Sequence, residues 1–213
     1  MIMLAAVLFL SACGDNSGNG TEATDAQETS EATGKTYAID AASSSVGWYG
    51  EKLAYGHNGT VGITEGSLSV ENGNITGGSF TLDMSTIKDL DVEEAEDRGN
   101  LEGHLMGEDF FDVAKYPTAK FEVTGSTAST EEGATHMVQG NLTIKDVTKN
   151  IEIPVNVEMT EGGIRATSTF SINRADFNVQ YGSKTFFDEL VDDKVISDEI
   201  KYTIALVGSE SAS

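Results

Sequence analysis

Apolar and polar residues alternate with a period of two along most of the chain after residue 35. Each such segment has one apolar and one polar face, which is typical of a half-buried β-strand. Two short segments, 61–63 and 68–70, precede Asn72-Gly73, a dipeptide typical of a tight hairpin turn. The other alternating segments are 46–48, 80–85, 119–124, 138–144, 151–159, 164–172 and 200–206.

This pattern predicts an all-β fold with about eight antiparallel strands. Every strand must bury its apolar face in the same interior, and no helical layer is available to cover an open sheet. A closed up-and-down barrel removes the exposed edges and solves this problem. We therefore expect an extended eight-stranded β-barrel over residues 35–208, followed by a disordered tail at 209–213. Eight strands enclose either packed side chains or one small ligand.

Two segments break the alternation. Residues 86–117 are long and acidic, and we expect them to be partly helical. In residues 184–194, the apolar residues Phe186, Phe187, Leu190 and Val191 follow helical spacing. Such segments either form a plug or lid at one end of a barrel or simply seal its core, and the sequence leaves both readings open.

The N-terminus combines an apolar run with the only cysteine. Residues 1–12 are too short to span a bilayer, which takes about 20 apolar residues, but their length fits a signal peptide. Leu10-Ser11-Ala12-Cys13 resembles the bacterial lipobox, which predicts cleavage before Cys13 and lipid attachment to it. The run lacks the basic residues that open a signal peptide, so we expect an upstream start or a shortened leader. The alternative is an apolar strand with an incidental buried cysteine.

Residues 13–34 are small, polar and acidic, and residues 14–34 contain neither Lys nor Arg. Such a segment cannot bury enough apolar surface to fold, so we expect a disordered tether between the lipidated Cys13 and the barrel. The expected organisation is a membrane anchor, a tether and one folded domain.

The formal net charge of the 213-residue chain is -22. Nucleic acids and anionic membrane surfaces attract basic patches, so neither is expected as a charge-driven partner. A single cysteine excludes an internal disulfide and a site of paired thiolates.

Catalytic and metal motifs are weak in this sequence. The histidines His57, His104 and His136 lie far apart, and no G-x-S-x-G nucleophile elbow occurs. Asp89, Asp91 and Glu93 suggest a calcium loop, but its glycine and closing acid are absent. We expect no enzymatic activity, no metal and no cofactor.

Several ordered motifs resemble the YceI-like family of bacterial periplasmic and lipoprotein domains. The resemblance covers about residues 36–207. The motifs are Tyr37-Ala38-Ile39-Asp40, Ser45-Val46-Gly47-Trp48, His57-Asn58-Gly59-Thr60, His104-Leu105, Asp109-Phe110-Phe111-Asp112, Tyr116-Pro117, the run 140–149, Ile172-Asn173-Arg174 with Phe177, and the run 195–200. The resemblance implies a lipocalin-like barrel that binds a long isoprenoid or a related amphiphilic lipid. Homodimers occur in the family, so a homodimer is a further expectation.

With this resemblance, the inward-facing apolar residues become candidates for the wall of a lipid cavity. The alternative is that they pack on one another as an ordinary core. The candidates are Trp48, Phe80, Leu82, Met84, Phe121, Leu142, Ile144, Ile153, Phe170 and Ile172.

Arg174 is two residues after Ile172 and four after Phe170, so the alternation predicts that its side chain also points inward. An inward guanidinium could bind the polar head of a lipid through paired hydrogen bonds. The competing interpretation is a structural pair with a buried acid such as Asp112. Phe110 and Phe111 either line the mouth of the barrel or anchor its loop.

The sequence thus predicts a lipid-anchored carrier or storage protein of the bacterial envelope. Gly14 stands where an aspartate would retain a lipoprotein at the inner membrane, which favours the outer membrane and its periplasmic side. The alternative is a structural or interaction module displayed on the membrane without a ligand.

Overall fold

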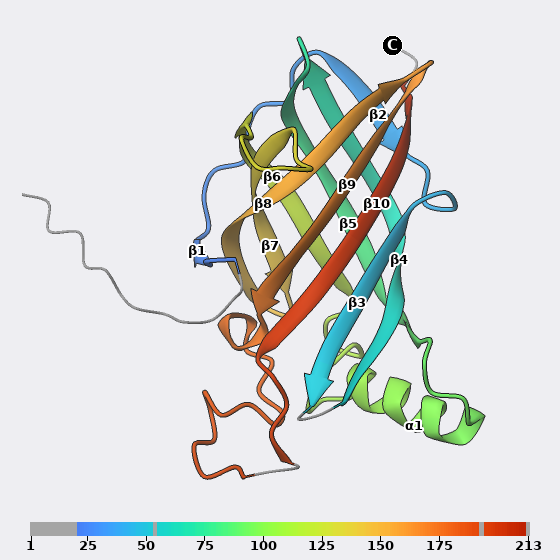
Figure 1. Ribbon diagram of the computed structural model, residues 1–213, viewed down its shortest axis with the longest axis vertical. Helices are drawn as coiled ribbons and strands as arrows, with labels where there is room; N and C mark the ends of the chain where they lie inside the picture. The colour runs from blue at the N-terminus through green and yellow to red at the C-terminus, as the bar shows by residue number, and fades with distance from the viewer. Residues whose placement is uncertain (1–20, 53–54, 192–193, 212–213) are drawn as a thin grey trace, which may run out of the picture.

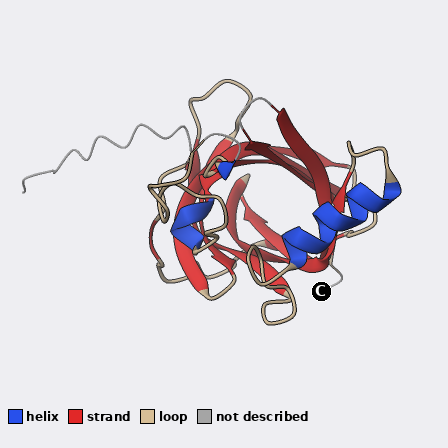
Figure 2. Ribbon diagram, turned by 90° about the horizontal axis from the view of Figure 1, so that it is seen from below, coloured by secondary structure: helices blue, strands red, loops and turns tan. Residues whose placement is uncertain are grey.

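The computed structural model describes residues 21–52, 55–191 and 194–211, and Cys13 with its signal segment lies outside them. Its core is a closed antiparallel barrel (Figures 1 and 2). The elements are β1 (Thr24–Asp25), β2 (Lys35–Ile39), β3 (Ser45–Lys52), β4 (Tyr55–Glu71), β5 (Asn74–Asp89), α1 (Ala95–Met106), β6 (Thr118–Ala128), β7 (His136–Ile144), β8 (Val147–Thr160), β9 (Gly163–Asn173), the 3-10 turn η1 (Arg174–Phe177) and β10 (Glu199–Glu210).

The barrel has eight strand positions because β2 and β3 share one. Next to β4, β2 pairs with the upper half of that strand and β3 with its lower half, and both also pair with β10. The chain turns between them at Asp40, whose carboxylate accepts hydrogen bonds from the Ala42 N–H and the Ser43 hydroxyl. From β4 onward, consecutive strands pair antiparallel, and β10 closes the ring by pairing with β2 and β3.

The expected strand pattern and its tight turns are confirmed. Asn72 and Gly73, between β4 and β5, both have positive φ (51° and 83°), as the predicted Asn-Gly turn requires. Inward-facing residues of the alternating segments form one continuous core, from Val46 on β3 to Leu206 on β10. The barrel is therefore the result of one repeated rule, an apolar face turned inward on every strand.

The structure differs from the expected tether over residues 21–34. This segment crosses the outside of the barrel (Figure 1): β1 pairs with β8, the Gln27 N–H and C=O both bond the side chain of Asn141, and the Ser30 N–H bonds the Val123 carbonyl. Its polar backbone is held by an outward-facing amide and by strand carbonyls. Counting apolar surface alone misses this source of order.

The same segment fills a seam between β8 and β9. These strands pair only over 156–160 and 163–167, and the Thr21 N–H bonds the Ser171 carbonyl lower down, at 2.8 Å. At the other end of the chain, Ser209 and Glu210 extend β10 against β2, so the expected tail is partly ordered as strand. We call residues 21–34 the strap.

Helical structure is sparse and lies at the lower end of the barrel in Figure 1. The expected helical part of 86–117 is α1, whereas residues 184–191, whose apolar residues follow helical spacing, form turns. Phe186, Phe187 and Val191 remain exposed there, so no packed apolar face stabilises a helix. In the described ranges, no helix is both long and apolar enough to span a membrane.

Candidate functional site

The lower half of the barrel encloses an apolar cavity of about 110 Å³. Its wall comes from inward-facing residues of the strands and from the segments that cover the lower end. All but one of the predicted wall residues lie on it: Trp48, Phe80, Leu82, Met84, Phe121, Leu142, Ile144, Ile153, Phe170 and Arg174. Whether these residues contact a lipid stays a prediction.

Ile172 is the exception. It lies on β9 between Phe170 and Arg174, with the inward parity that the sequence indicated, but it is not part of the cavity wall. Its side chain is only 1% exposed, and neighbouring core residues enclose it completely. Phe170 and Arg174 on either side of it reach the cavity, so the wall skips Ile172, which alternation along the strand cannot show.

Two aromatic pairs narrow the cavity. The rings of Phe80 and Phe121 stack with centroids 5.5 Å apart, and those of Phe170 and Tyr202 stack at 5.7 Å. Burial raises the pKa of the Tyr202 phenol, so this hydroxyl stays protonated and neutral. The wall therefore offers a ligand mainly ring faces and aliphatic groups.

Segments outside the strands also contribute to the wall. Phe110 and Phe111 follow α1, pack edge to face at 5.2 Å and both contact the cavity, as do Leu105 of α1 and Ile196 of the loop before β10. The sequence did not decide whether Phe110 and Phe111 line the mouth of the barrel or anchor its loop. In the structure they both contact the cavity and pack against each other, so they fit both roles. Leu105 and Ile196 were missed because the motifs that contain them assign no direction to their side chains.

Arg174 lies at the floor of the cavity, buried to 1% exposure. Its Nε donates to the Ser197 carbonyl at 2.9 Å, and its Nη1 to the Val179 carbonyl at 2.8 Å. Its Nη2 donates to the Ile196 carbonyl at 3.1 Å.

The acid that pairs with this guanidinium is Asp198, 3.2 Å from Nη2, and not the suggested Asp112. The Phe110 ring covers the guanidinium at 5.5 Å. Burial lowers the pKa of Arg174, and the charge of Asp198 partly opposes this shift. These contacts describe a structural arginine that fastens the loop before β10 to the end of β9.

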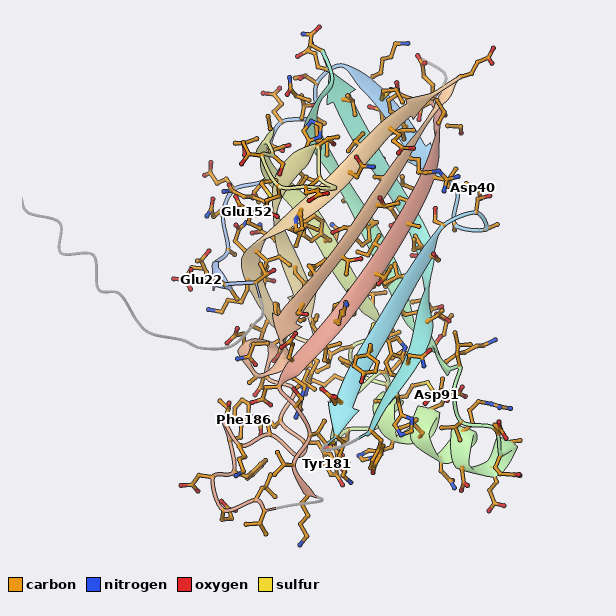
Figure 3. The ribbon with its side chains drawn as sticks, viewed as in Figure 1. Glu22, Asp40, Asp91, Glu152, Tyr181 and Phe186 are labelled. Carbon is orange, nitrogen blue, oxygen red and sulfur yellow. The ribbon has the colours of Figure 1, made fainter. Side chains whose placement is uncertain are left out.

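The rim at this end carries exposed apolar side chains. Figure 3 shows Tyr181 and Phe186 on the loop below the strands, and Asp91 beside α1. The exposed large apolar residues of this end are Tyr49, Tyr55, Leu90, Tyr181, Phe186, Phe187 and Val191. His104 of α1 packs edge to face on Tyr181 at 4.4 Å, which joins the helix to the loop.

The family model for the YceI-like domain matches residues 37–207, which is most of the chain. The chain belongs to the YceI-like family. Among curated relatives, a UPF0312 protein of Photorhabdus laumondii is 36% identical over 118 residues, which cover 47% of this chain and 58% of the relative. A UPF0312 protein of Pseudomonas syringae pv. tomato is 42% identical over 85 residues, covering 36% and 42%. The chain thus spans about half the length of the curated relatives it matches.

Solved structures share this YceI-like fold. BcnA of Burkholderia cenocepacia aligns with a TM-score of 0.64 and 22% identity, over 79% of this chain and 98% of BcnA. A polyisoprenoid binding domain of Saccharophagus degradans, implicated in plant cell wall breakdown, aligns with a TM-score of 0.56 and 17% identity, over 82% and 98%. At these identities the likeness establishes the common barrel.

Proposed function

We propose that the barrel binds one chain of a long amphiphilic lipid of isoprenoid type and acts as a non-catalytic carrier or store. The main support for this proposal is the apolar wall of the cavity. Its one buried cation among the described residues, Arg174, already donates hydrogen bonds to backbone carbonyls. A hydrocarbon chain gains about 0.8 kcal/mol for each methylene moved from water into such a wall. The polyisoprenoid binding domain of Saccharophagus degradans has the same fold, which supports this ligand class.

The small volume of the cavity favours a second candidate function. Ligand pockets usually measure roughly 300–1,000 Å³, whereas this cavity measures about 110 Å³. A lipid would enter as a single extended chain and would rotate ring pairs such as Phe80 and Phe121 aside. Without such movement, the protein is a structural or interaction module displayed on the membrane with no lipid inside.

The proposal includes a membrane anchor at Cys13 and a place on the periplasmic side of the outer membrane. The lipobox-like Leu10–Cys13 and the residue that follows it support this placement. A Cys13→Ser substitution is expected to abolish metabolic labelling of the full chain with an acyl precursor. Labelling that survives the substitution would contradict the anchor.

Native mass spectrometry of the full chain, purified in detergent from bacterial membranes, tests the ligand. The carrier predicts a mass adduct after incubation with a long isoprenoid alcohol, whereas the display module predicts none. The same spectrum counts the subunits and so checks the predicted homodimer.

A pair of matched substitutions locates the ligand. Ala119 lies on the wall of the cavity, whereas Ala38 on β2 is exposed to solvent. Ala119→Leu should weaken isoprenoid binding about 10-fold or more, because displacing two methylenes forfeits about 1.6 kcal/mol. Ala38→Leu should leave binding unchanged. Equal effects of the two substitutions would place the ligand elsewhere.

A further inference from the structure

A second cluster of polar side chains lies outside the cavity, where β4 begins and β5 ends. His57 stands near the start of β4, Asp89 is the last residue of β5, and Asp91 follows in the loop toward α1. The register of the two strands places Gly59 opposite Asp89, and this pairing brings His57 to the loop. The groups are therefore neighbours although about 30 residues separate the histidine from the acids.

Each carboxylate uses one oxygen for the protein and leaves the other toward the same point. Asp89 Oδ1 accepts the N–H groups of Asp91 and Val92, at 3.1 and 2.7 Å. Asp89 is only 3% exposed, and its buried Oδ2 has no hydrogen-bond partner. Asp91 Oδ1 accepts the N–H of Asn58 at 3.1 Å, and its Oδ2 faces His57 Nδ1 at 3.3 Å.

The spacing of these atoms matches the coordination of a small metal ion. Ligands of tetrahedral Zn²⁺ lie about 2.0–2.2 Å from the ion and hence about 3.4 Å from one another. His57 Nδ1 lies 3.3 Å from Asp91 Oδ2 and 3.9 Å from Asp89 Oδ2, and one ligand atom from each of the three residues falls within 4.8 Å of the other two. The side chains of His57 and Asp91 are each about a third exposed, so small rotations can close the remaining gap.

We propose that His57, Asp89 and Asp91 bind a divalent transition-metal ion of the Zn²⁺ type. One imidazole and two carboxylates suit such an ion, whereas Ca²⁺ takes six to eight oxygens and Mg²⁺ a full octahedron. Three protein ligands leave a fourth position for water.

The unpartnered oxygen of Asp89 distinguishes this cluster from an ordinary surface ion pair. A salt bridge between His57 and Asp91 needs no third group, yet Asp89 is held beside it by two backbone N–H groups of its own loop. Burial raises the pKa of Asp89, while the hydrogen bonds from Asn58 and its neighbours hold the pKa of Asp91 below its usual range against the effect of burial. A bound cation would supply a positive charge to compensate the buried carboxylate of Asp89.

Metal binding by the full chain is tested with Zn²⁺ alone, in excess Mg²⁺ to suppress general attraction to the acidic surface. We expect one Zn²⁺ per chain by isothermal titration and elemental analysis, and a rise in the melting temperature. Asp89→Asn keeps the size and the Oδ1 acceptor but removes the charged ligand oxygen. It should weaken Zn²⁺ binding at least about 10-fold and abolish the rise.

Asp83→Asn is the matched control. Asp83 lies on the same strand, and its Oδ1 also accepts a backbone N–H two residues on, from Ser85 at 2.9 Å. This variant should bind Zn²⁺ as the unchanged chain does. His57→Gln should also weaken Zn²⁺ binding. Co²⁺ bound to the unchanged chain should show d–d absorption, and this absorption should be lost in the His57→Gln variant. No binding in excess Mg²⁺, or equal binding by the Asp89 and Asp83 variants, would overturn the proposal.

Discussion

Arg174 and Asp89 are two buried charged residues at the same end of the barrel, and their surroundings are opposite. Arg174 donates to three backbone carbonyls, pairs with Asp198 and lies under the Phe110 ring. Asp89 is satisfied at one oxygen and bare at the other. Burial of a charge is thus ambiguous by itself, and the bonding of each of its atoms separates a structural group from a candidate binding group.

Loss of the arginine should have the largest effect. Arg174→Met leaves Asp198 without its ion-pair partner and three carbonyls without their buried donor, and we expect the free energy of unfolding to fall by about 3–5 kcal/mol. Urea unfolding followed by tryptophan fluorescence measures this. Arg165→Met, on the exposed face of β9, should change stability by less than about 0.5 kcal/mol. A similar cost at both positions would show that the bonds of Arg174 are dispensable.

A buried amide should give an intermediate effect, because its partners lie on the strap. Asn141 exchanges two hydrogen bonds with Gln27 and one with Asn150. Asn141→Ala should cost about 1–2 kcal/mol and speed hydrogen exchange at the amides of Gln27 and Ser30. Unchanged exchange at these amides would mean that the strap is held by other contacts.

The smallest loss is expected at Asp89. In the metal-free protein, Asp89→Asn should be at least as stable as the unchanged chain at about pH 7, because it removes a bare buried charge. The folded pKa of Asp89 lies above the usual 3.8, so its contribution to stability is present at low pH and declines as pH rises through the folded pKa.

The asparagine variant lacks this decline, so its advantage should grow as pH rises from about 3.8 through the folded pKa of Asp89. Urea unfolding at several pH values measures the difference. An advantage that shrinks over this range would contradict the shifted pKa of Asp89.

Much of the barrel could be predicted because its strands obey one local rule. Alternation along 151–159 needs only neighbouring residues to be visible, and the Asn72-Gly73 turn carries its own backbone preference. The same alternation placed Phe80, Phe121 and Leu142 on the inner face, where the cavity wall lies.

What the sequence hid depends on register and on partners distant in the chain. The meeting of His57 with Asp89 rests on strand pairing between β4 and β5, which includes several register shifts. The partner of Arg174 is Asp198, which a loop brings back from 24 positions further on. The order of the strap depends on Asn141, whose outward amide has no signature in an alternating pattern.

The hydrogen bond from Thr21 to Ser171 sets where the chain leaves the barrel, close to the lower end of β9. With an acyl anchor at Cys13, roughly eight residues would connect bilayer and barrel, and an extended chain of that length spans at most about 28 Å. This reach is slightly less than the thickness of the hydrocarbon core itself, about 30 Å. Such a short connection would restrict how far the barrel can move from the bilayer. It would keep the cavity end, with Tyr181 and Phe186 on its rim, within reach of the lipid headgroups.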